Sequence, residues 1–114
     1  MIKKIKRPTA TLGELLAQWL LKGSELVRKP SHDISFRGDK IEVKSARPSL
    51  GGGQTRGWFF CVNKKAQKRW AKRFWFLCFN EFCQLERLYV VPTSEVIGNS
   101  TIWINKNWEQ YRVE

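Results

Sequence analysis

Cysteine, histidine and long apolar runs are all scarce in this chain. Its 114 residues include three cysteines, Cys61, Cys78 and Cys83, and one histidine. The cysteines are odd in number and form no Cys-x-x-Cys pair, which argues against a disulfide framework or a structural zinc centre and favours the reducing cytoplasm. Cys61 and Cys78 stand in apolar runs, where we expect them to be small buried residues. No apolar run of about 18 residues could span a bilayer.

Acidic residues are also few. The chain has 21 Lys and Arg against 10 Asp and Glu, a formal net charge of +11. Such a field attracts polyanions, so we expect DNA as the partner, with RNA not excluded. An anionic membrane surface is the weaker alternative, and we expect no membrane association.

The length of 114 residues predicts one domain. We divide the chain into a basic leader, residues 1–10, and a single domain, residues 11–114. We expect no targeting segment, because Glu14 and Gln18 interrupt the apolar stretch after the leader, and no small-residue cleavage site follows.

A first helix is predicted from Leu12 to Lys22, because leucines and Trp19 recur there at helical spacing. Thr11 and Glu14 form a capping-box pattern at its start. Glu14 therefore has two interpretations. Its carboxylate caps the backbone amide of the N-cap residue, or it contributes to a metal site.

Residues 33–46 alternate between polar and apolar side chains and predict a β-hairpin. With Gly38-Asp39 as a two-residue turn, Ile34 pairs with Val43, and Asp33 with Lys44. Side chains alternate faces along a strand. The predicted hairpin thus has one apolar face, with Phe36 and Ile41 among its members, and one polar face with Asp33, Ser35, Glu42 and Lys44.

The polar face combines residue types that suit phosphodiester hydrolysis. Mg²⁺ prefers oxygen ligands and is often held by one or two carboxylates together with a substrate phosphate. Asp33 and Glu42 could supply the carboxylates, and Lys44 could orient the attacking water or neutralise charge on the phosphate. The alternative is an ordinary solvated face of an amphipathic hairpin.

Asp33, followed nine residues later by Glu42-Val43-Lys44, in a hairpin after a helix, resembles the PD-(D/E)XK nuclease superfamily. His32 stands where the family pattern has proline. The resemblance implies an α/β fold with a restriction-endonuclease-like core, a mixed central β-sheet flanked by helices. It also implies that Asp33 and Glu42 bind Mg²⁺, for which Mn²⁺ can substitute, that Lys44 is the catalytic lysine, and that Glu14 is a secondary metal ligand.

Three further strands are predicted at residues 57–62, 74–79 and 87–91, where apolar runs are typical of strands covered on both faces. Residues 92–97 predict a short helix with Ser94 as its N-cap. Residues 101–104 predict an edge strand. The loop at residues 47–56 contains Pro48 and three consecutive glycines and lies next to the hairpin.

Residues 63–73 are strongly basic. If this segment is helical, Ala66 and Trp70 face inward and the cations form an outer face that contacts phosphates. The alternative is a solvated connection. The predicted nucleic-acid-binding residues are Arg47, Arg56, Lys64, Lys65, Lys68, Arg69, Lys72 and Arg73.

These features predict a Mg²⁺-dependent DNA endonuclease, either a structure-selective enzyme like a Holliday-junction resolvase or a nuclease of a phage or mobile element. Cutting both strands needs two sites, so we expect a homodimer, with Trp103 and Trp108 as candidates for its surface. One alternative is a catalytically inactive nucleic-acid-binding module on a nuclease scaffold. Another is a basic protein that binds an acidic protein partner.

Overall fold

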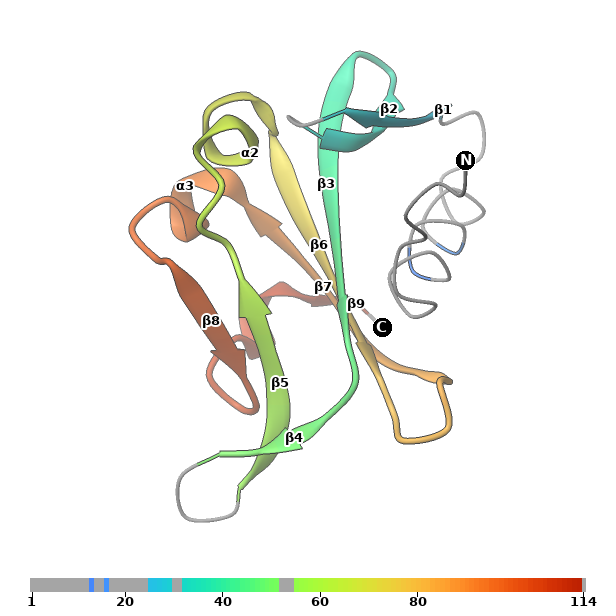
Figure 1. Ribbon diagram of the computed structural model, residues 1–114, viewed down its shortest axis with the longest axis vertical. Helices are drawn as coiled ribbons and strands as arrows, with labels where there is room; N and C mark the ends of the chain where they lie inside the picture. The colour runs from blue at the N-terminus through green and yellow to red at the C-terminus, as the bar shows by residue number, and fades with distance from the viewer. Residues whose placement is uncertain (1–12, 14–15, 17–24, 30–31, 52–54, 114) are drawn as a thin grey trace, which may run out of the picture.

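The computed structural model describes residues 13, 16, 25–29, 32–51 and 55–113, with side chains for all of these except 25–29, 32 and 33 (Figure 1). Gly13 and Leu16 are helical, as predicted. The rest of the predicted helix at residues 12–22, including Glu14, lies outside the described residues, as do the leader and residues 52–54.

The larger sheet has the strand order β1-β2-β3-β6-β7-β9. The only parallel pair among these strands is β3 with β6, and the other neighbours are antiparallel. A parallel pair needs a crossover connection, and the chain between β3 and β6 forms two short strands and a helix. The sheet's strands are β1 (Glu25–Lys29), β2 (His32–Phe36), β3 (Asp39–Ala46), β6 (Arg73–Phe79), β7 (Leu85–Pro92) and β9 (Arg112–Val113).

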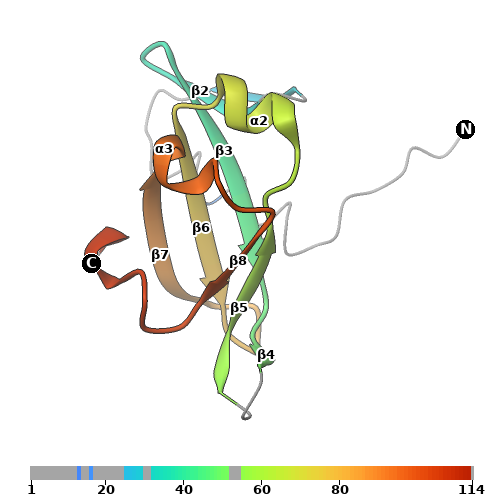
Figure 2. The same cartoon turned by 90° about the vertical axis from the view of Figure 1, so that its left-hand side faces the viewer.

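A smaller antiparallel sheet contains β4 (Ser49–Leu50), β5 (Arg56–Cys61) and β8 (Thr101–Ile104), in the order β4-β5-β8. It forms a second layer beside the larger sheet (Figures 1 and 2). Phe74, Phe76 and Cys78 of β6 pack there against Trp58 and Phe60 of β5. The Trp58 indole N–H also donates a 2.7 Å hydrogen bond to the Phe79 carbonyl, which ties the two sheets together.

A second apolar cluster fills the opposite face of the larger sheet. Ile41 and Val43 of β3 pack there with Leu77 of β6, and Leu16 packs against them from the N-terminal segment. Gly13 lies so close to β3 that a Cβ atom would stand 1.8 Å from the Ser45 Oγ. A larger residue at position 13 would therefore force the Ser45 hydroxyl to shift.

The expected mixed sheet is confirmed, but the expected flanking by helices is wrong for the described part of the chain. The α-helices described there in full are short, α2 (Lys65–Trp70) and α3 (Thr93–Val96), with a 3₁₀ turn, η2 (Glu109–Tyr111). A sheet covers one face where helices were expected. The domain is therefore a mixed, β-rich α/β structure.

The strands predicted at residues 57–62, 74–79, 87–91 and 101–104 are confirmed by β5, β6, β7 and β8. Phe74 to Phe79 are all buried, in agreement with a strand covered on both faces. The predicted N-cap Ser94 is wrong, because α3 starts at Thr93 and Pro92 precedes it. The Thr93 hydroxyl donates to the Ala71 carbonyl instead.

The predicted hairpin exists, but its register is shifted by two residues. Ile34 pairs with Ile41 rather than Val43, and the turn is Arg37-Gly38. Both turn residues have positive φ, 50° and 82°, as a type I′ turn requires. A shift of two residues preserves the faces, so Ile34 and Ile41 still share the apolar face.

Candidate functional site

Strand β3 carries Glu42 and Lys44 on the face that turns toward the smaller sheet. Glu42 lies beside Phe74 and Lys44 beside Phe76 in the parallel β3–β6 ladder, and both phenylalanines belong to the core between the sheets. The Glu42 side chain is only 2% exposed, whereas Lys44 is half-buried. A carboxylate and an amine thus lie two residues apart at the margin of an apolar core.

Position 33 lies in β2, antiparallel to β3. The β2–β3 register pairs Ile34 with Ile41, and its continuation by one residue brings position 33 level with Glu42. The side chain of Asp33 is outside the description, and so is Glu14. Among the described side chains, no group of three His, Cys, Asp or Glu residues is close enough to hold a metal ion.

The donor chemistry of these positions fits Mg²⁺ or Mn²⁺. A hard cation takes one or two carboxylates and completes its shell with water and phosphate oxygens. Glu42 could supply one carboxylate, and Asp33 occupies the adjacent register position on β2. Lys44 is on the same face as Glu42, because residues two apart in a strand share a face.

Gln67 is a residue that the sequence interpretation missed. It is buried, with 6% exposed, on the inner side of α2, and its Oε1 has no hydrogen-bond donor among the described residues. Ala71 follows one helical turn later and is also buried. The prediction that Trp70 faces inward is therefore wrong, because Trp70 is 53% exposed. The spacing gave no signal for this choice, because Ala66 and Trp70 are four residues apart, as are Gln67 and Ala71.

Arg47 and Arg56 hold carboxylate and carbonyl groups of the protein. Arg56 forms ion pairs with Glu81 at 2.6 Å and with Glu86 at 2.7 Å. The Arg47 guanidinium donates a 2.9 Å hydrogen bond to the Glu81 carbonyl. The hydrogen bonds from Arg56 lower the pKa of both glutamates, and the same bonds raise the pKa of Arg56. This is a stabilising network more than a free basic surface.

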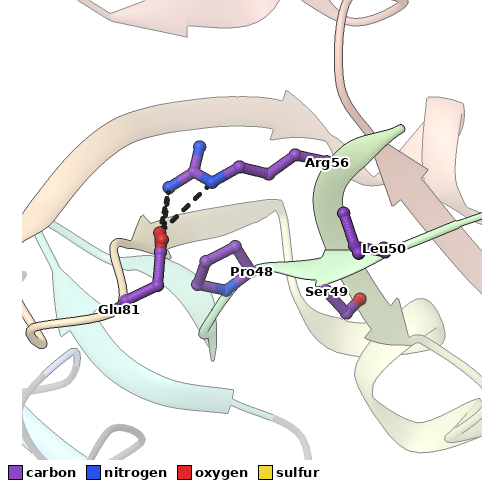
Figure 3. Close-up of a pocket in the computed structure, with 5 residues that line it drawn as sticks. All are labelled: Pro48, Ser49, Leu50, Arg56 and Glu81. Carbon is purple, nitrogen blue, oxygen red and sulfur yellow. Dashed lines mark hydrogen bonds and ion pairs between the residues drawn. The ribbon is translucent and has the colours of Figure 1, made fainter. Parts of the chain in front are cut away.

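The pocket near these residues has a volume of about 190 Å³ and is lined by Pro48, Ser49, Leu50, Arg56 and Glu81 (Figure 3). In the close-up, the Arg56 guanidinium extends toward the Glu81 carboxylate beside the Pro48 ring. The pocket holds neither Glu42 nor Lys44. The two charged residues in its wall, Arg56 and Glu81, already pair with each other.

The basic residues around α2 are arranged differently from Arg47 and Arg56. Lys64, Lys65 and Arg69 are exposed. The Lys68 amine donates to the Asn99 carbonyl. The Asp39 carboxylate lies 3.2 Å from the Lys72 Nζ and 3.9 Å from an Arg73 nitrogen.

An exposed aromatic ring stands among these cations. The Lys40 Nζ lies 5.3 Å from the centre of the Trp70 ring, and the Arg69 Cζ lies 5.1 Å from it. We call Lys40, Arg69 and Trp70 the Trp70 cluster. It combines positive charge with an exposed aromatic side chain.

The remaining cysteine and tryptophan predictions have mixed outcomes. Cys78 is buried as expected, and desolvation raises the pKa of its thiol. Cys61 is exposed, so its predicted burial is wrong, because its side chain points away from the core between the sheets. Trp103 and Trp108 are both half-buried. Trp103 packs over Gly51 and Gly57, and Trp108 packs against the core and the Tyr111 ring.

No protein-family model matches the sequence, and no curated protein is significantly similar to it. Within the described residues, no helix has the length and apolar character needed to cross a membrane. The functional argument therefore rests on the residues themselves.

Proposed function

We propose that this protein is a metal-dependent DNA endonuclease of the PD-(D/E)XK type. In this proposal Asp33 and Glu42 hold Mg²⁺ or Mn²⁺, with Glu14 as a secondary ligand, and Lys44 assists hydrolysis of the phosphodiester bond. Lys64, Lys65 and the other cations of residues 64–73 bind the DNA backbone. Arg56 contributes less than these, because Glu81 and Glu86 share its charge.

The buried carboxylate of Glu42 carries the proposal. Removing an ionised carboxylate from water costs several kcal/mol, and even a buried ion pair is often no more stable than apolar residues of the same volume. Packing alone would therefore favour an apolar residue beside Phe74, at a position that is 2% exposed. A requirement for oxygen donors at this position explains why the sequence has glutamate.

Lys44 supports the same interpretation. It is on the Glu42 face and is half-buried. An ammonium at that position can neutralise charge that develops on a phosphate during hydrolysis. A bound divalent cation would lower the pKa of a coordinated water and so provide the nucleophile.

The test is cleavage of end-labelled duplex, four-way-junction and single-stranded DNA with Mg²⁺, Mn²⁺ or EDTA. We compare the wild type with Asp33→Asn, Glu42→Gln and Lys44→Met, which remove charge with little change in side-chain size. We expect wild-type cutting that requires metal, and a loss of at least about a hundredfold in each variant. Binding measured in EDTA should persist in all three.

Lys106→Gln is the matched control, because Lys106 is exposed and far from β3 in the chain. It should cut like the wild type. If the wild type binds every substrate but cuts none with either metal, the enzyme proposal fails and a binding module on a nuclease scaffold remains. If Glu42→Gln retains full activity and its normal melting temperature, Glu42 is not a metal ligand.

A further inference from the structure

Trp70 is exposed although large aromatic side chains usually gain free energy from burial. It is 53% exposed, and it is the last residue of α2, whose inner side is occupied by Gln67 with Ala71 directly after the helix. A single exposed aromatic residue is common on protein surfaces. What distinguishes Trp70 is that Lys40 and Arg69, from two different elements, both lie over its ring.

The backbone that carries Trp70 is held firmly. The Ala71 amide donates to the Gln67 carbonyl at 2.9 Å, and the Ala71 carbonyl accepts a 2.7 Å bond from the Thr93 hydroxyl. The Lys72 amide donates to the Lys40 carbonyl at 2.7 Å. These bonds tie the end of α2 to β3 and α3, so the ring is presented from a fixed position.

The Trp70 cluster lies at the same end of the larger sheet as the candidate metal site. Lys40 and Glu42 are two residues apart on β3 and share a face, which separates their backbone positions by about 7 Å. The Lys40 side chain reaches the Trp70 ring. A DNA strand with a phosphate at Glu42 and Lys44 therefore has its neighbouring nucleotides within reach of Trp70.

We propose that the Trp70 cluster is a stacking platform for an unpaired base of the DNA substrate, next to the phosphate that is cut. This inference rests on the proposed function and names its substrate class, which is DNA with a single-stranded or unpaired region. The base stacks on the indole, and one of the two cations, Lys40 or Arg69, turns from the ring to an adjoining phosphate. Paired bases inside a continuous duplex do not expose their faces in this way.

The energies favour this exchange. A cation over an exposed aromatic ring contributes about 2- to 5-fold, whereas a base stacked on an aromatic side chain contributes about 5- to 150-fold in affinity. A displaced Lys or Arg also gains a phosphate partner. Replacement of one cation by a base therefore yields a net gain in binding.

A lipid surface is the other polyanion that a basic, aromatic patch could contact. Interfacial helices bury a broad apolar face in the headgroup region. Helix α2 has six residues, Lys65–Trp70, and three of them are Lys or Arg. Its outer side therefore offers one ring among cations, which matches a nucleotide strand better than a membrane.

The test measures fluorescence anisotropy of a labelled single-stranded oligonucleotide and of its duplex, both in EDTA so that no cutting occurs. Trp70→Ala should weaken binding of the single strand by about 5- to 100-fold and binding of the duplex by less than about twofold. Trp70→Phe, which keeps an aromatic face, should stay within about threefold of the wild type. Trp70→Leu, which keeps apolar bulk without a π-face, should behave like Trp70→Ala.

Phe59→Ala is the matched control, because Phe59 is also an exposed aromatic residue, 50% exposed on β5. It should leave both affinities unchanged, and equal melting temperatures verify that each variant is folded. The platform is excluded if Trp70→Ala binds the single strand like the wild type, or weakens both substrates equally. It is also excluded if the variant loses binding only to anionic phosphatidylserine vesicles.

The two proposals fail in different ways. Cleavage that needs Glu42 but is accompanied by unchanged single-strand binding in Trp70→Ala leaves the nuclease and removes the platform. Selective loss of single-strand binding in Trp70→Ala, in a wild type that cuts nothing with any metal, leaves the platform and removes the nuclease.

Discussion

The two ends of the molecule use positive charge differently. At the end where β5 begins and the β6–β7 turn lies, Arg56 forms ion pairs with Glu81 and Glu86, and Arg47 binds the Glu81 carbonyl (Figure 1). At the end where α2 lies, Lys40 and Arg69 rest on the Trp70 ring. The first end uses its cations for internal structure. At the second end Lys72 and Arg73 also pair with Asp39, but Lys40 and Arg69 are presented with an aromatic ring.

The difference shows that net charge does not locate a binding surface. Arg47, Arg56 and the lysines of residues 64–73 look alike in the sequence and contribute equally to the charge of +11. Two of them are committed to Glu81 in the structure. Binding free energy should therefore depend on the α2 end, and folding free energy on the Arg56 end.

The largest effect should come from neutralising the α2 end. Lys64 and Lys65 are exposed, and replacing both with Gln removes two of the proposed phosphate contacts. We expect DNA affinity to fall roughly thirtyfold at about 0.15 M salt, and the slope of log K against log salt to decrease by about 2. Binding titrations at several salt concentrations measure both quantities.

The matched control removes the same charge from the opposite end. Arg47→Gln with Arg56→Gln should change DNA affinity by less than about threefold, because only long-range attraction is lost. If both double variants weaken binding equally, the ends are equivalent and the contrast between them is wrong.

A smaller effect is expected on stability. Arg56→Gln breaks the bonds to Glu81 and Glu86 and leaves two carboxylates near each other. Partly exposed ion pairs contribute little each, so we expect a loss of about 1 kcal/mol in the free energy of unfolding. Urea denaturation at neutral pH measures this loss. Lys65→Gln, at the α2 end, should leave stability unchanged within about 0.5 kcal/mol.

Much of the fold follows from apolar patterning. The run at residues 74–79 predicts a strand buried on both faces, and Phe74 to Phe79 are all buried in β6. The two faces of the β2–β3 hairpin are also predictable, because a register shift of two residues preserves them. The exact register was not predictable, because Arg37 occupies a turn position with positive φ that the sequence does not signal.

Local sequence patterns do not predict how the second sheet assembles or which side of α2 faces inward. β4 in the second sheet and β9 in the larger sheet have two residues each, too few for any periodicity. In α2, tertiary packing turns Gln67 inward and Trp70 outward, although hydrophobicity alone predicts the reverse. The types of the candidate site residues are visible in the sequence. The burial of Glu42 depends on the smaller sheet, toward which this face of β3 turns.

Acid should weaken the Arg56 end in a predictable direction. The hydrogen bonds from Arg56 hold the pKa of Glu86 below its ordinary value of 4.5. Glu86 therefore contributes stability that is fully present above about pH 4.5 and is lost as the pH falls through the lowered pKa. Glu86→Gln should lose less free energy of unfolding between pH 7 and pH 3 than the wild type. The difference should be below about 1 kcal/mol. A variant that declines as steeply as the wild type would show that this ion pair is not the acid-sensitive group.

The smallest effect concerns Arg37, in the hairpin turn that leads into β3. Arg37 has φ of 50° and precedes Gly38, in a type I′ turn where Asn-Gly is the preferred pair. Asn tolerates positive φ better than Arg, so Arg37→Asn should stabilise the fold by about 0.5 kcal/mol, visible as a rise of roughly 2 to 4 °C in melting temperature. Gly38→Ala, at φ of 82°, should do the opposite.

If Arg37→Asn is more stable and also binds DNA more weakly, the arginine at this turn position contributes to DNA binding at some cost in stability. If it is less stable, the Arg37 guanidinium over the Phe36 ring, 5.0 Å from its centre, contributes more than the backbone strain costs.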